Sequence, residues 1–170
     1  MENRALICRS CRGTRLKRKF GSHRYVESGL SNVFLENIET AECLECGAKA
    51  VSIPAIARLH ELLARTIARS VPRLSANEIR FLRKFLGWSG KDFAGKIGVS
   101  VETVSRWENA REAMGVPAER LLRALVLRSG PDRKALDRIE DLALKGASPR
   151  NRIRLELENN AWRFERDTAG

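Results

Sequence analysis

The four cysteines of this chain fall into two Cys-x-x-Cys pairs, Cys8/Cys11 and Cys43/Cys46. A gap of two residues lets both sulfurs of a pair reach one ion, and four thiolates complete the tetrahedral shell typical of structural Zn²⁺. A stretch of about 50 residues has too little core to fold alone, so the ion would supply part of the folding free energy. We therefore expect a β-rich four-cysteine zinc module over residues 1–52.

Other uses of the cysteines stay open at this point. Two disulfides or a redox pair fit the same spacing, whereas a catalytic zinc ion is disfavoured because four thiolates leave no position for water. No apolar run reaches the roughly 20 residues that a membrane helix requires, and the first residues lack an apolar signal core. We expect a cytoplasmic protein without membrane contact, in which thiols stay reduced. Between the pairs, Tyr25-Val26 and residues 33–38 predict short strands.

The chain is strongly basic, with 32 Lys and Arg against 21 Asp and Glu and a formal net charge of +11. Such an excess favours a polyanionic partner, because each cation near a phosphate releases counterions. A basic run follows the first cysteine pair and predicts either a nucleic-acid contact or a solvated rim: Arg12, Arg15, Lys17, Arg18 and Lys19. The only histidines, His23 and His60, belong to no recognisable acid or nucleophile arrangement, so we do not expect an enzyme.

Helical patterns dominate the middle of the chain. Apolar residues recur at helical spacing from Pro54 to about Arg69, which predicts a connecting helix within a linker region of residues 53–73. Residues 74–130 then predict four helices, at about 75–86, 89–96, 101–109 and 117–127. Three sequence signals mark helix starts, two of them capping boxes: Ser75-x-x-Glu78, Ser89-x-x-Asp92 and the N-cap residue Ser100.

Gly98-Val99 separates the second and third of these helices by a turn of helix-turn-helix length. We expect one common core in this all-α bundle, built by apolar residues of all four helices. Its predicted members are Ile79, Leu82, Leu86, Phe93, Ala94, Ile97, Val99, Val104, Trp107, Leu121, Leu122 and Leu125.

The helix at 101–109 has the composition of a DNA-reading helix. Arg106 can pair with guanine O6 and N7, and Glu102 can accept from cytosine N4. Alternatively the two form a surface ion pair with each other, since they lie four residues apart. The predicted base contacts are Val101, Glu102 and Arg106. The predicted phosphate contacts are Ser89, Lys91, Ser100, Thr103, Ser105 and Arg111.

The order of these motifs resembles the MqsA-type (YgiT-like) antitoxins. The likeness rests on the two cysteine pairs, Gly47, the linking helix and Val101-x-x-x-Ser-Arg-Trp-Glu108. It implies four zinc ligands at the cysteines, an Xre-class helix-turn-helix, a homodimer that represses its own operon, and a ribonuclease toxin as partner. By position Arg106 matches the family's base-reading arginine. Glu102 replaces the usual asparagine, and Gly90 replaces a glutamine that holds phosphate.

Residues 131–170 predict a short helix from Pro131 to Leu144 and then a β-hairpin. Apolar and charged residues alternate on both sides of Asn159-Asn160, a pair that tolerates a two-residue turn. A hairpin folded there places the following residues opposite one another: Leu157 and Trp162, Leu155 and Phe164, Glu156 and Arg163, Arg154 and Glu165. A helix with Ile153, Leu157, Ala161 and Phe164 on one face is the alternative, and the surface on which a hairpin would pack stays open.

Together these patterns predict an α+β chain, with a four-cysteine zinc module, an Xre-type helix-turn-helix bundle and a C-terminal hairpin. We expect a homodimeric, sequence-specific repressor that binds double-stranded DNA at a palindromic operator, with Zn²⁺ as a structural ion. The function predicted first is the antitoxin of a type II toxin-antitoxin system. The alternatives are a phage or plasmid regulator without a toxin, or an RNA- or ribosome-associated zinc protein.

Overall fold

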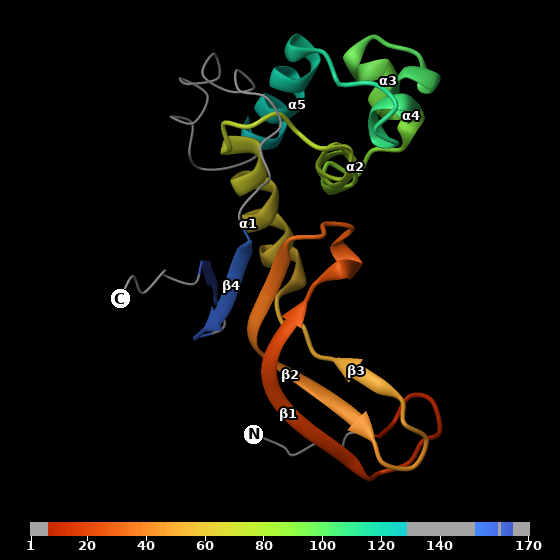
Figure 1. The fold of residues 1–170 in the computed structure, drawn as a ribbon, viewed down its shortest axis with the longest axis vertical. Helices are drawn as coiled ribbons and strands as arrows, with labels where there is room; N and C mark the ends of the chain where they lie inside the picture. The colour runs from red at the N-terminus through yellow and green to blue at the C-terminus, as the bar shows by residue number, and fades with distance from the viewer. Residues whose placement is uncertain (1–6, 129–151, 160, 165–170) are drawn as a thin grey trace. The chain divides into compact units, whose positions relative to one another are not determined.

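The computed structural model describes residues 7–128, 152–159 and 161–164 (Figure 1). The chain forms two compact units. One contains Met1–Tyr25, Asn32–Ile56 and Arg152–Gly170, and the other contains Val26–Ser31 and Ala57–Asn151. The helix predicted from Pro131 to Leu144 lies outside the described residues. None of the described helices has the length and apolar character needed to cross a membrane.

A five-stranded sheet organises the first unit. Its strands are β1 (Leu16–Arg24), β2 (Val33–Cys43), β3 (Lys49–Val51), β4 (Ile153–Glu158) and β5 (Ala161–Phe164). The order is β1-β2-β4-β5, and β3 also pairs with β2 (Figure 1). β2 is long enough to take β3 and β4 along different parts of its length, because β3 pairs at Thr40 to Glu42 and β4 at Val33 to Glu36.

The basic run of the sequence analysis is largely strand β1, paired antiparallel with β2. The strand predicted at Tyr25-Val26 is wrong, because β1 ends at Arg24 and Val26 begins a short 3-10 helix, η1 (Val26–Ser28). Lysine is a poor strand former, and on β1 the basic residues lie opposite or beside acidic residues of β2. Lys17 lies opposite Glu42, and Arg18 Nη1 lies 3.4 Å from Glu39 Oε1.

The predicted C-terminal hairpin is confirmed, with the predicted register. Leu155 lies opposite Phe164, Glu156 opposite Arg163 and Leu157 opposite Trp162, whereas Glu165 lies outside the described residues. Its packing surface, left open by the sequence, is β2, which pairs with β4 in parallel. The Trp162 indole donates to the Pro54 carbonyl over 2.9 Å. Residues from both ends of the chain therefore share one sheet.

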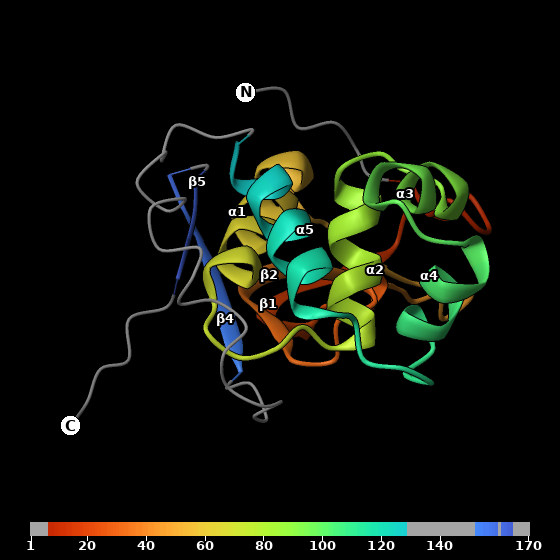
Figure 2. The same cartoon turned by 90° about the horizontal axis from the view of Figure 1, so that it is seen from above.

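The second unit contains α1 (Ile56–Arg69) from Ala57 onward, together with α2 (Ala76–Phe85), α3 (Gly90–Ile97), α4 (Val101–Glu108) and α5 (Val116–Arg128) (Figure 2). Both predicted capping boxes are confirmed, with Ser75 and Glu78 starting α2 and Ser89 and Asp92 starting α3. Each box satisfies two backbone donors that a helix start leaves unpaired.

Apolar side chains from all five helices build the core of this unit. Most of the predicted members are buried, but Leu121 is 42% exposed, and Leu86, Ile97, Val99 and Leu125 are half-buried. The prediction for Leu121 is wrong because α5 packs a different helical face against the core. Its buried residues are Glu119, Leu122, Arg123, Val126 and Leu127.

Candidate metal centre and nucleic-acid interface

The four cysteines converge at one end of the sheet. Cys8 Sγ lies 3.7 Å from Cys46 Sγ, Cys11 Sγ lies 3.6 Å from Cys43 Sγ, and all four sulfurs lie within 4.8 Å of one another. A tetrahedral site with Zn–S bonds of about 2.3 Å requires sulfurs roughly 3.8 Å apart. A disulfide requires about 2 Å, and all four thiols are free. The cluster therefore fits a tetrahedral metal ion better than two disulfides.

Two equivalent backbone turns present the sulfurs. Arg12 donates its amide to the Cys8 carbonyl and Gly47 donates to the Cys43 carbonyl, each over 2.9 Å. Both donors have left-handed backbones, with φ of 61° at Arg12 and 73° at Gly47. Glycine adopts this conformation without strain, whereas a residue with a β-carbon does not. Gly47 marked the second turn in the sequence, but nothing in the sequence indicated that Arg12 forms the matching turn.

Backbone amides and neighbouring thiols set the proton affinities of the cluster. Hydrogen bonds from the backbone of Cys11 and Ser10 lower the pKa of Cys8 to about 7. The Gly13 amide also lowers the pKa of Cys11, but the crowded thiols of Cys46 and Cys43 outweigh it and raise that pKa to about 12. Four thiolates so close together need a cation, which is the usual role of a metal ion at such a site.

Glu45 links the two turns from the tip of the second one. Its Oε1 accepts from the Arg15 amide over 3.3 Å and lies 3.6 Å from Arg15 Nε. A β-carbon at Gly13 would lie 2.5 Å from the Glu45 carboxylate. Any larger residue at Gly13 must therefore displace that carboxylate, which was not foreseen from the sequence.

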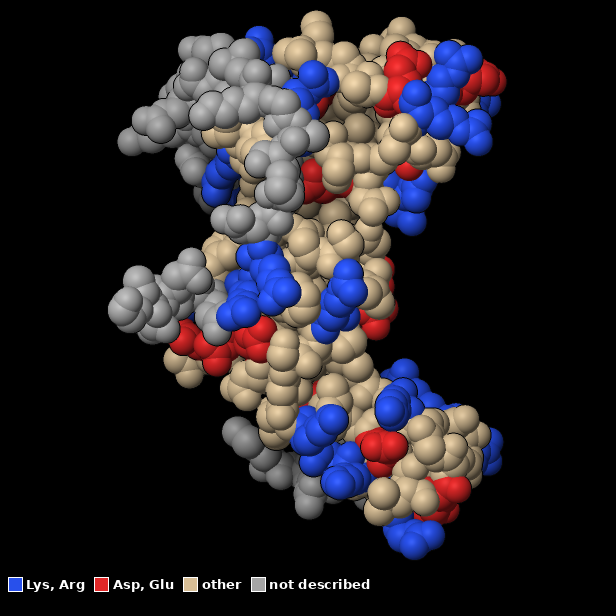
Figure 3. All heavy atoms as spheres, viewed as in Figure 1, with Lys and Arg blue, Asp and Glu red and all other residues tan. Residues whose placement is uncertain are grey.

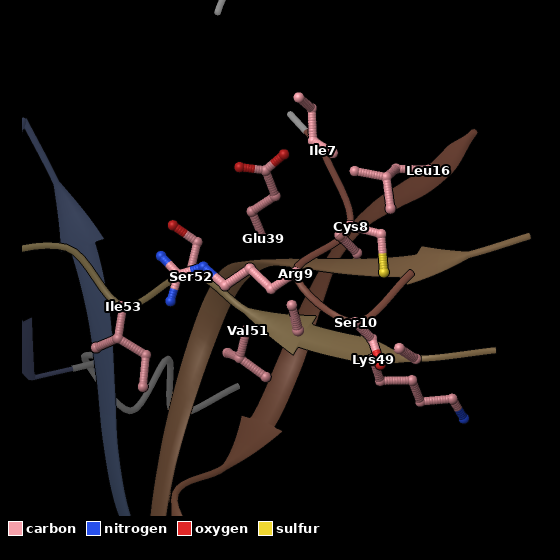
Figure 4. Close-up of a pocket in the computed structure, with 13 residues that line it drawn as sticks. Ile7, Cys8, Arg9, Ser10, Leu16, Glu39, Lys49, Val51, Ser52 and Ile53 are labelled. Atoms are coloured by element: carbon pink, nitrogen blue, oxygen red, sulfur yellow. The ribbon is translucent and has the colours of Figure 1, made fainter. Parts of the chain in front are cut away.

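A hollow of about 670 Å³ lies beside the cluster and is bordered by Cys8 (Figure 4). Alanines on β2 and β3 contribute to it, because their small side chains leave the sheet face open. Its ionisable neighbours besides Cys8 are Arg9, Glu39 and Lys49. The described lining residues include no histidine, and no nucleophile with an adjacent base stands out among them.

The helical unit contains the predicted two-helix arrangement. Gly98 ends α3 with φ of 77°, and Ser100 caps α4 by accepting from the Thr103 amide over 3.1 Å. Val101, Glu102, Ser105 and Arg106 are exposed along α4 and line a shallow surface hollow with Arg111. Val104 and Trp107 of the same helix are buried, so α4 has one packed face and one open face.

The ion pair considered between Glu102 and Arg106 does not form in the part of the chain that the structure describes. Arg106 instead pairs with Glu112, with 3.8 Å between Nη1 and Oε2. The pKa of Glu102 is lowered by its own backbone amide, then by the Ser100 hydroxyl and the Arg106 charge. Glu102 therefore remains an ionised acceptor. Basic and acidic side chains are mixed over α3 and α4 (Figure 3).

The predicted phosphate contacts differ in how free their donors are. At the start of α3, the Ser89 amide and hydroxyl both donate to Asp92 Oδ2, over 2.9 and 2.7 Å. These hydrogen bonds lower the pKa of Asp92 and keep it anionic. Ser100 and Thr103 bond to each other over 3.1 Å, and Ser105 accepts from Asn109. Lys91 and Arg111 are exposed, with no hydrogen bond or ion pair from their side chains among the described residues.

Sequence reasoning missed the residue that fixes the end of α4. Glu108 is buried and accepts from Arg83 through both carboxylate oxygens, over 2.6 and 3.0 Å. Arg83 also donates to the Trp88 carbonyl over 2.6 Å, and Arg80 donates to the Glu108 carbonyl over 2.7 Å. One arginine thus holds α2, the end of α4 and the approach to α3 together. No local signal in the sequence pairs Arg83 with Glu108.

Comparison with known families agrees with this geometry over α3, α4 and the neighbouring helices. Residues 79–125 match the family model described as Helix-turn-helix. No curated protein and no solved structure matches the chain significantly. The matched segment begins within α2 and ends within α5. It supports assignment of the chain as a DNA-binding transcription regulator.

Proposed function

We propose that this protein is a sequence-specific repressor whose helix-turn-helix reads duplex DNA through α4. The observation that carries the proposal is the exposed row of Val101, Glu102 and Arg106 on α4, inside the matched residues. Arginine can make two hydrogen bonds to guanine in the major groove. Lys91 and Arg111 add cations that suit phosphates.

Zn²⁺ is the proposed ion of the first unit, held by Cys8, Cys11, Cys43 and Cys46. Four sulfur ligands favour Zn²⁺, and the absence of an open position gives the ion a structural role. With this closed site and no nucleophile–base arrangement among the described residues of the hollow beside it, we propose a regulator and not an enzyme. The bound metal content of purified protein tests the assignment, with one Zn²⁺ per chain expected.

The finer function rests on the resemblance to MqsA-type antitoxins. We propose a homodimer that binds a palindromic operator in front of its own gene and neutralises a ribonuclease toxin. Co-purification with the product of an adjacent small gene tests the toxin, and its absence would favour a regulator without one.

Arg106→Ala tests base reading directly. A selected duplex is first obtained by in vitro selection with the wild-type protein. The variant should lose about 1–3 kcal/mol of preference at one base pair per half-site, because one bidentate contact is removed. Equal weakening on every sequence would show that Arg106 contacts phosphate only. Competition with RNA at the same salt concentration separates this proposal from RNA binding, because salt controls both affinities.

A further inference from the structure

The ion pair between Arg106 and Glu112 leaves most of the arginine fork unused. The contact involves Nη1 alone, and no other side-chain partner of Arg106 is present among the described residues. The side chains are 61% and 49% exposed, so the pair by itself contributes little to stability. The 3.8 Å separation is longer than a hydrogen bond, so Glu112 attracts one nitrogen electrostatically. Nε and Nη2 remain available, and the guanidinium can still present its other edge to a base.

The turn after α4 brings Glu112 back beside Arg106. Arg111 donates its amide to the Arg106 carbonyl over 2.9 Å, and Ala110 donates to the Trp107 carbonyl over 3.3 Å. Ala110 has φ of 56°. These are the two hydrogen bonds and the left-handed residue of a Schellman turn, which usually contains glycine. An alanine in this conformation is strained, so the surrounding contacts must enforce the turn.

Contacts on both sides of Glu112 hold this loop. The Asn109 amide group donates to the Ser105 carbonyl over 2.8 Å, and Arg80 reaches Asn109 Oδ1 over 3.2 Å. On the other side Met114 is buried, and its carbonyl accepts from Arg73. Glu112 is therefore carried by a short segment with fixed ends, unlike a carboxylate on an unsupported surface loop.

We propose that Glu112 is a positioning residue that orients Arg106 toward a guanine and so sets base preference. The proposal rests on the proposed function of Arg106. A carboxylate near DNA also repels phosphates, so Glu112 lowers attraction to duplexes of any sequence. Orientation of Arg106 raises the affinity for duplexes with the contacted guanine, and repulsion of phosphates lowers the affinity for duplexes of any sequence. Together they increase the ratio of specific to non-specific affinity.

The test uses the full chain and the Glu112→Gln variant, which keeps the shape and removes the charge. Affinities are measured at one salt concentration for the selected duplex, for the same duplex with the contacted guanine replaced, and for an unrelated duplex. We expect non-specific affinity to rise and preference for the guanine to fall roughly three- to tenfold, which is part of the value of one bidentate contact. Matching thermal unfolding of the variant and wild type checks the fold.

Two control variants separate the possible failures. Arg111→Gln should weaken binding to all duplexes equally, because it removes a phosphate-binding cation next to Glu112. The preference for the guanine should stay unchanged. If Glu112→Gln instead raises all affinities equally, Glu112 is only a repelling charge, and if it lowers them equally, it only supports the loop; either result overturns the proposal. Unchanged base preference in Arg106→Ala would overturn the proposed reader itself.

Discussion

Arg123 and Glu119 form an ion pair on α5 with both side chains completely buried, over 2.7 Å between Nη2 and Oε1. Arg123 also donates to the carbonyls of Ala68, Ser70 and Pro72, over 3.1, 2.5 and 2.7 Å. These carbonyls lie at the end of α1 and just after it, where a helix leaves acceptors unpaired. A charge on α5 therefore acts as a C-terminal cap for α1.

Removing the anion from this pair should lower the free energy of unfolding far more than removing the anion of an exposed pair. Glu119→Gln leaves Arg123 buried without a counter-charge, and it also disturbs the bonds that Glu119 accepts from Arg73 and Leu74. We expect the free energy of unfolding to fall by about 3–5 kcal/mol. Denaturant unfolding of the variant measures it.

The matched control is Glu61→Gln, which removes the anion of the i,i+4 pair with Arg65 on α1. That Glu61 side chain is 46% exposed, so the loss should be at most about 1 kcal/mol. Equal losses in the two variants would mean that burial of Glu119 is not what makes its pair important.

The left-handed turn at Arg12 gives a second prediction. Arg12→Gly should stabilise the metal-binding unit by about 1 kcal/mol, because glycine adopts φ of 61° without the clash of a β-carbon. Gly47→Ala should destabilise it by a similar amount at the matching turn. Competition between the protein and a chelator measures both substitutions as changes in metal affinity. Arg12→Gln controls for the lost charge, because glutamine keeps the β-carbon. If Arg12→Gln stabilised the unit as much as Arg12→Gly does, the left-handed backbone would not be the cause.

Metal removal and acid should act through the same four sulfurs. A chelator should unfold the first unit, with loss of amide protection in β1 to β3, because the proposed ion would hold the cysteine turns together. Metal affinity should fall as pH falls, since metal binding releases protons from thiols and the pKa of Cys11 is about 12 without a cation. Zinc affinity that does not change between about pH 6 and 8 would rule out coordination by ionising thiols.

His60 predicts a pH dependence in the other unit. Burial lowers the pKa of His60 on α1, where its ring meets Phe81 edge-on at 5.9 Å between centroids. The folded state then binds fewer protons than the unfolded chain at mildly acidic pH, so stability is present above the unfolded pKa of about 6.5 and is lost as pH falls below it. Urea unfolding of wild type and His60→Gln at about pH 5 and 7.5 measures the effect. The variant should lose less stability on acidification.

Local signals predicted the elements that local interactions decide. Ser89 with Asp92 marked a helix start, and Asn159-Asn160 marked a hairpin turn, because each involves residues within a few positions. The parallel pairing of β2 with β4, the Arg83–Glu108 contact and the Arg106–Glu112 contact were not predicted. The first two depend on side chains or strands brought together by tertiary packing, for which periodicity along the chain carries no information. The third depends on the local turn after α4, whose left-handed residue is Ala110 and not the glycine that would have marked it.

The parallel contact between β2 and β4 ties the sheet that carries the cysteine cluster to a segment far later in the sequence. Val33 pairs with Ile153, and the Ile153 amide donates to the Asn32 carbonyl over 2.9 Å. A nascent or C-terminally shortened chain would have the cysteines but would expose one edge of β2 to other strands. Expression of this protein without residues 152–164 should therefore yield a product that keeps the four cysteines but is prone to aggregate. A purification tag is better placed away from β4 and β5.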